Sequence, residues 1–172
     1  MSRDYPDWVN PWTAAEGQRQ FAGSMALCQM PRLLPLLSSE GGLVRFEMAF
    51  EMDRDRRPEI AIRVSAQLPL LCQRSLQQYL EPVSRNSTVS VLKTLAEQDL
   101  LPEDAEPVLV EVGRIALRQL IEDELLLAVP LVPRNPELEA VELSTGKHEF
   151  EEDAKRQPFA ELAKLKSSLE QE

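Results

Sequence analysis

The chain has 172 residues and carries 19 basic against 29 acidic side chains, which gives a net charge of −10. This length allows one domain with a core and flanking tails, and it is too short for two full domains. The negative charge opposes loose association with DNA phosphates or anionic lipid, and no apolar run has the length of a membrane span. We therefore expect a cytoplasmic protein without DNA or membrane partners, in which any nucleic-acid contact is local.

The N-terminal segment carries a helix signal at Asn10-Pro11. An asparagine side chain caps a helix, and proline suits the first turn because that position donates no intrahelical hydrogen bond. These two residues predict a short helix over about 11–21. The apolar stretch 30–37 contains two prolines, so it predicts at most a short or broken helix.

Alternation of apolar and polar side chains predicts a β-hairpin in the middle of the chain. Residues 44–52 alternate in this way, and the pattern resumes over 60–68 after a charged turn. Because the turn is short, we expect these two strands to pair antiparallel. Pro82 marks an edge or a bulge in the region that follows. Three further strands are predicted over residues 76–80, 83–92 and 108–112.

A long amphipathic helix is predicted over 113–129. Its apolar residues recur at helical spacing, and Pro130 ends it. We expect this helix to cover the sheet, with Glu122 and Asp123 facing outward. Glu124 falls beside the apolar stripe, where burial demands a basic or donor partner, so we predict a structural ion pair there.

Together these elements predict an α+β fold, in which an antiparallel sheet or partial barrel is covered by one main helix, with short terminal helices. Like charges and prolines over 97–106 predict an open, mobile acidic loop. In this interpretation residues 1–133 form a single domain and 134–157 an acidic flexible linker. Residues 158–172 form a helical tail with Phe159 and Leu162 on its apolar stripe.

The sequence lacks the residues of a metal centre or of the common catalytic sites. A structural zinc site needs about four sulfur or nitrogen ligands, and the chain offers only Cys28, Cys72 and His148. His148 has no serine or cysteine nucleophile near it in sequence, and no glycine-rich phosphate loop occurs. We expect no enzyme activity and no cofactor, with Cys72 a buried thiol. A metal shared between two chains stays as the alternative.

Arginines concentrate around the predicted hairpin and the strands that follow it. Six of them could form one positive edge that binds RNA phosphates: Arg54, Arg56, Arg57, Arg63, Arg74 and Arg85. An equally good interpretation pairs them with acidic neighbours on the surface, such as Asp55 and Glu59. The N-terminal aromatic side chains fit a stacking platform for bases or, better, packing anchors: Tyr5, Trp8, Trp12 and Phe21.

Four motifs, which together cover nearly the full chain, resemble the YceD family in their order. The run from Ile121 to Pro133 resembles the family's signature helix and exit, with Glu122, Asp123, Glu124, Pro130 and Pro133. The other three are Asn10-Pro11-Trp12, similar to the opening helix, Cys72-Gln73-Arg74, similar to the start of a Cys-x-Arg-Cys element, and Pro158-Phe159 with Leu162, similar to the closing motif. Ser75 stands where the family has its second cysteine, which argues against a metal site.

The resemblance implies a role in the accumulation of large-subunit (23S) ribosomal RNA, through binding of that RNA or of a precursor particle and without catalysis. A second hypothesis belongs to another class of protein, an acidic adaptor for a basic ribosomal protein or assembly factor. Such an adaptor would hold its partner on Glu103, Asp104, Glu106 and the acidic segment 149–153.

Overall fold

The computed structural model describes residues 5–102, 105–110 and 112–138. The chain divides into one compact unit that ends at Glu137 and a second that begins at Leu138, and the description that follows concerns the first. Its elements, in chain order, are β1 (Trp8–Val9), α1 (Pro11–Glu16), β2 (Gln20–Ala26), η1 (Leu27–Gln29), η2 (Leu34–Leu36), β3 (Leu43–Met52), β4 (Pro58–Leu71), β5 (Gln78–Leu92), η3 (Leu95–Leu100), β6 (Glu106–Leu109), β7 (Ile115–Ala116) and α2 (Leu117–Ala128).

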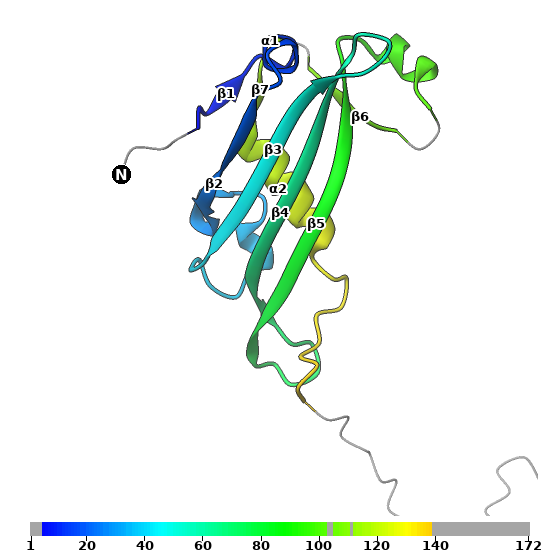
Figure 1. Ribbon diagram of the computed structural model, residues 1–172. Coiled ribbons are helices and arrows are strands. Elements are labelled where there is room, and N and C mark those ends of the chain that lie inside the picture. The colour runs from blue at the N-terminus through cyan, green and yellow to red at the C-terminus, as the bar shows by residue number, and fades with distance from the viewer. Residues whose placement is uncertain (1–4, 103–104, 111, 139–172) are drawn as a thin grey trace, which may run out of the picture. The chain divides into compact units, whose positions relative to one another are not determined.

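A five-stranded sheet in the order β2-β3-β4-β5-β6 dominates this unit (Figure 1). The predicted hairpin is confirmed as β3 and β4, which pair antiparallel from Val44 opposite Ala66 to Met52 opposite Pro58. β5 is one continuous strand where two were predicted, and it pairs antiparallel with β4 along its length. β1 and β7 form a separate two-stranded sheet.

The predicted fold class, an antiparallel sheet or partial barrel under one main helix, is wrong. More of the described residues lie in strands than in helices, and the sheet is open and mixed because β6 lies parallel to β5. Helical cover is divided among α1, α2 and three 3₁₀ segments. After β5 the chain passes through η3 and comes back beside β5, so that β6 runs in the same direction as β5. The alternation of apolar and polar side chains does not indicate whether two strands pair parallel or antiparallel. The same path explains why 97–106 is not simply an open loop.

The predicted helix 11–21 is correct only in its first half. Asn10 caps α1, accepting hydrogen bonds from the amides of Trp12 and Thr13 at 3.0 and 3.3 Å, but α1 ends at Glu16. The residues beyond it form the edge strand β2. A side chain at Gly23 would place its Cβ 2.7 Å from the Tyr5 ring, so glycine there lets Tyr5 pack across the strand.

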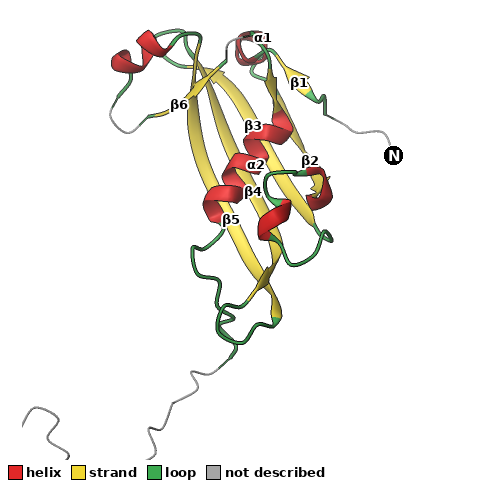
Figure 2. Cartoon of the chain, turned by 180° about the vertical axis from the view of Figure 1, so that it is seen from behind, coloured by secondary structure: helices red, strands yellow, loops and turns green. Residues whose placement is uncertain are grey.

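The apolar face of the sheet packs against α2, which lies across the strands on one side (Figures 1 and 2). The helix predicted over 113–129 begins only at Leu117, because Ile115 and Ala116 form β7 instead. The core contains Phe46, Met48 and Phe50 of β3 together with Leu117, Ile121 and Leu125 of α2. The opposite face of the sheet carries no helix among the described residues.

Two buried carboxylates attach α2 to the rest of the domain. Glu124 pairs with Arg85 Nε at 2.9 Å and accepts a hydrogen bond from Ser87 Oγ at 2.6 Å, which confirms the predicted ion pair. The outward orientation predicted for Glu122 is wrong, since this residue is 2% exposed. Its carboxylate instead binds the loop between β2 and β3, which contains η1 and η2.

The Glu122 carboxylate holds that loop by its backbone. Its Oε1 atom accepts hydrogen bonds from the amides of Arg32 and Leu33 at 2.7 and 3.2 Å, and Oε2 accepts one from Arg32 Nε at 3.2 Å. The neighbouring Asp123 is half-exposed and pairs with Arg32 Nη1 at 2.7 Å. The stretch predicted as a broken helix over 30–37 therefore takes its shape from a side chain on α2.

Replacing Glu122 should cost far more stability than replacing its neighbour. Glu122→Ala leaves two backbone amides without acceptors, and we expect the free energy of unfolding to fall by about 3 kcal/mol. Asp123→Ala, the matched control, removes only a half-exposed ion pair and should cost under about 1 kcal/mol. Urea denaturation of both variants measures the difference, and equal losses would contradict this role of Glu122.

Candidate nucleic-acid interface

The turn between β3 and β4 is organised by Arg57. Its Nε donates to Asp53 Oδ2 at 3.0 Å, its Nη2 to Asp55 Oδ2 at 2.6 Å, and its Nη1 to the carbonyl of Leu100 at 3.3 Å. The backbone amide of Arg57 also donates to Asp53 Oδ1 at 2.7 Å. One arginine therefore engages both aspartates of the turn and attaches it to η3.

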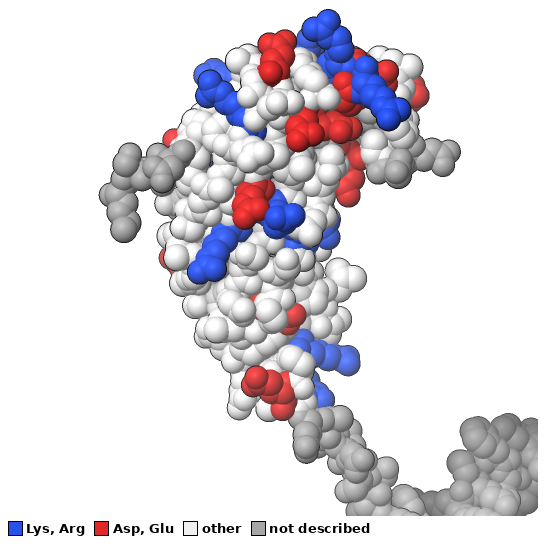
Figure 3. Space-filling model, in the orientation of Figure 1, with Lys and Arg blue, Asp and Glu red and all other residues white. Residues whose placement is uncertain are grey.

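The other two arginines of this turn, Arg54 and Arg56, have exposed side chains. Neither forms an ion pair with any residue that the structure describes. Arg56 has φ of 60°, in the left-handed region that side-chain-bearing residues seldom adopt, so the turn geometry holds it in a defined place. Figure 3 shows basic and acidic side chains crowded together at this end of the sheet.

A hollow lies beside this turn, between α1 and the end of β5. It is lined by Trp12, Asp55, Arg56, Arg57, Val91, Lys93, Glu97 and Leu100. The Lys93 ammonium lies 4.8 Å from the centroid of the Trp12 ring, a cation–π contact. Sequence reasoning missed Lys93 as a partner of Trp12, because no local pattern relates two residues so far apart in the chain.

The structure separates the four N-terminal aromatic side chains. Tyr5 packs edge-on against Phe46 with ring centroids 4.8 Å apart, and Phe21 packs in the same way against Phe50 at 5.7 Å. Trp8 is 58% exposed beside β7. The packing interpretation thus holds for Tyr5 and Phe21, while Trp12 alone faces the hollow beside the arginine turn.

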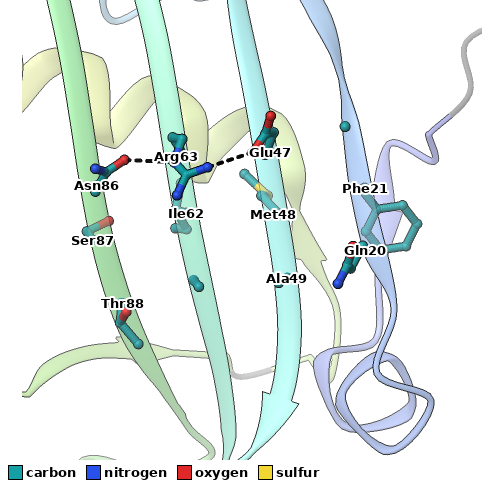
Figure 4. A pocket seen from close by; sticks show the side chains of 12 residues that line it. Gln20, Phe21, Glu47, Met48, Ala49, Ile62, Arg63, Asn86, Ser87 and Thr88 are labelled. Atoms are coloured by element: carbon teal, nitrogen blue, oxygen red, sulfur yellow. Dashed lines mark hydrogen bonds and ion pairs between the residues drawn. The ribbon is translucent and has the colours of Figure 1, made fainter.

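The other three candidate arginines lie elsewhere, so the six do not form one positive edge. Arg63, on the uncovered sheet face, donates to Glu47 at 3.0 Å and to Asn86 at 3.2 Å (Figure 4). Arg85 lies on the α2 side, bound to Glu124. Arg74 lies in the turn at the far end of β4, on the order of 40 Å from the β3–β4 turn at about 3.3 Å per residue.

The uncovered sheet face also presents Arg45, which was not among the predicted site residues. The strand register places it in one row with Ser24, Ser65 and Ser84. Arg45 is exposed and forms no ion pair within the described part of the chain. Its alternation with buried Val44 and Phe46 is the signal that could have placed it on this face.

The turn between β4 and β5 binds the segment that follows α2. Cys72 is fully buried, and its Sγ accepts a hydrogen bond from the amide of Asn135 at 3.4 Å. The amide of Gln73 donates to the carbonyl of Pro133 at 2.9 Å. Hydrogen bonds from the Ser75 side chain, and then from the amides of Asn135 and Ser75, lower the pKa of the Cys72 thiol to about 6.

Comparison with known proteins bears on the motifs that meet at this turn. A family model described as large ribosomal RNA subunit accumulation protein YceD matches residues 60–166. The protein of that name from Haemophilus influenzae is 32% identical over 167 residues, covering 94% of this chain and 95% of the relative. The chain belongs to the YceD family. No solved structure matches it.

Two segments distant in sequence therefore meet at this turn. The segment Cys72-Gln73-Arg74 is joined to the stretch after α2 by one backbone hydrogen bond, from Gln73 to Pro133, and by the bond from the Asn135 amide to Cys72 Sγ. Within this described region no three Cys, His, Asp or Glu side chains are close enough together to hold a metal ion. The Ser75 side chain acts as a hydrogen-bond donor to Cys72.

Several predicted residues lie outside the described part of the YceD chain. These are the closing-motif residues Pro158, Phe159 and Leu162, the residues 139–157 of the predicted linker, His148, and the acidic positions Glu103, Asp104 and 149–153. None of the described helices has the length and apolar character of a membrane span.

The lowered pKa of Cys72 predicts a pH dependence of stability. An unfolded cysteine titrates near 9.0 and the folded one near 6, so the thiolate stabilises the folded state fully above pH 9 and loses this effect as pH falls through 6. The unfolding free energy of the parent protein, relative to Cys72→Ala, should rise between pH 6 and 9 in urea denaturation. Cys28→Ser, which alters an exposed thiol, should keep the parent's slope. Parallel curves for parent and Cys72→Ala would contradict the assignment.

Proposed function

We propose that this YceD protein supports the accumulation of large-subunit ribosomal RNA by binding that RNA or a precursor particle, without catalysing a reaction. The family and the name of the Haemophilus relative support the process. The single observation that carries the binding site is a pair of exposed guanidinium groups at the β3–β4 turn, Arg54 and Arg56, that form no ion pair with the described residues. The other three candidate arginines lie away from this turn and are not part of the proposed site: Arg63, Arg74 and Arg85.

The number of charged side chains at this turn explains why Arg54 and Arg56 have no aspartate partner there. The turn holds three arginines and two aspartates, and Arg57 binds both aspartates by itself. Arg54 and Arg56 are therefore paired with neither aspartate of the turn, on a chain of net charge −10. Guanidinium groups bind phosphate oxygens in pairs, and the negative charge elsewhere would turn the approaching RNA toward this end.

Reversal of the two free charges should weaken RNA binding in a salt-dependent way. Arg54→Glu with Arg56→Glu removes two phosphate contacts, so the slope of log K against log salt should fall in magnitude by about 1.4 for single-stranded RNA. We expect affinity for large-subunit RNA fragments, measured by fluorescence anisotropy at low salt, to drop by at least about tenfold.

The matched control is Arg45→Glu with Arg134→Glu, two exposed arginines away from this turn that undergo the same change of charge. This double variant should keep most of the parent's affinity and its salt slope. If both double variants lose binding equally, RNA affinity follows net charge alone and the hairpin site is wrong. Thermal unfolding of each variant shows whether the fold survives.

A second candidate function, an adaptor for a basic protein, is favoured by one cross-strand contact. Glu51 of β3 lies directly opposite Glu59 of β4 in the register of the hairpin. Like charges in this arrangement destabilise a sheet, and a cationic partner would relieve the repulsion. Of the acidic residues first predicted for this role, Glu106 is described and exposed at the start of β6.

Neutralising this glutamate pair separates the two functions. Glu51→Gln with Glu59→Gln should raise the unfolding free energy by about 0.5 kcal/mol, because the repulsion is removed. If the protein is an adaptor, the variant should also lose affinity for basic large-subunit ribosomal proteins in titration calorimetry. If it is an RNA-binding factor, RNA affinity should stay the same or rise, since two negative charges near the hairpin are gone.

A further inference from the structure

We infer that the hollow beside the β3–β4 turn binds a single unpaired RNA nucleotide whose base carries an exocyclic amino group. The inference rests on the proposed RNA binding and adds the class of nucleotide and the residues that select it. The hollow has a volume of about 490 Å³, within the range of small-molecule sites in proteins. Its lining combines one aromatic ring, cations and carboxylates.

Trp12 supplies the surface on which a base stacks. The indole is half-buried, and the Asn10 cap fixes the start of the helix that carries it. Lys93 lies over the ring in the free protein, 4.8 Å from its centroid. A stacked base contributes more than an exposed cation–π contact, so a base can replace the ammonium group over the ring.

The displaced Lys93 and the free Arg56 supply the phosphate contacts. The lysine side chain is long and flexible, and it keeps its charge when it leaves the indole. Arg56 lines the same hollow and forms no ion pair with the described residues. A nucleotide with its base on Trp12 would thus find two cations at the rim for its phosphate group, one of them part of the site proposed above.

Asp55 and Glu97 line the hollow, and each has one carboxylate oxygen that accepts no described hydrogen bond and can select the base. Asp55 accepts a hydrogen bond from Arg57 through Oδ2 only, and Glu97 accepts one from the amide of Lys93 through Oε2 only. The remaining oxygens are acceptors without donors among the described hydrogen bonds. Adenine, cytosine and guanine present an amino group to such acceptors, whereas uracil presents two carbonyl oxygens beside its one N–H and is repelled.

Tryptophan fluorescence tests this inference, because Trp8→Phe leaves Trp12 as the only tryptophan. In that background we expect oligoadenylate and oligocytidylate hexamers to quench Trp12, and oligouridylate to bind about tenfold more weakly. Trp12→Leu should abolish the preference, measured by anisotropy of labelled hexamers. Glu97→Gln, which leaves the indole in place, should reduce the discrimination against uridine, because an amide can donate as well as accept.

The outcomes separate this inference from the proposed function. If large-subunit RNA binds through Arg54 and Arg56 but the hexamers show no base preference and no quenching, the nucleotide pocket is wrong and the RNA site stands. Equal affinity for adenosine monophosphate and for the hexamer would show a free-nucleotide site and would overturn the RNA assignment of the pocket. If no RNA binds at all, both proposals fail.

Discussion

The position of α2 depends on two carboxylates that are buried on it and point to different partners. Glu124 reaches Arg85 and Ser87 on β5, and Glu122 reaches the backbone of the loop that contains η1 and η2. Burying a carboxylate is costly unless its oxygens receive hydrogen bonds, so each contact tolerates little displacement of the helix. The helix, the sheet and this loop are thereby held together on one side of the sheet.

The two ends of the long strands have different roles in this arrangement. At one end the turn around Cys72 binds the segment after α2 through a backbone hydrogen bond and a bond from the Asn135 amide to the Cys72 thiol. At the other end Arg57 neutralises two aspartates and leaves two arginines and a tryptophan-lined hollow accessible. The turn around Cys72 therefore holds the chain together, while the arginine turn keeps exposed basic side chains.

Burial explains why the arginines differ so much from one another. Arg57 and Arg85 are mostly covered and hold acidic partners whose removal would leave charges without compensation. Arg63 is exposed and bridges Glu47 and Asn86 across three strands, a contact that contributes little to stability. Only the positions without such partners have their full hydrogen-bonding capacity free for a ligand.

Several features of this protein were determined by sequence alone, because they depend on local periodicity. Alternation set the hairpin of β3 and β4, helical spacing set α2, and the place of Glu124 beside an apolar stripe predicted its ion pair. The order of short motifs also identified the YceD family, which the comparisons confirm.

Tertiary structure decided what depends on the path of the chain between elements. The parallel direction of β6, the burial of Glu122, and the meeting of Trp12 with Lys93 each join residues far apart in sequence. The scattering of the six arginines has two causes: strand length separates the turns at the two ends of β4, and the pleat puts Arg63 and Arg85 on opposite faces of the sheet. Periodicity reports which face a side chain occupies, and only the packed chain decides what lies opposite that face.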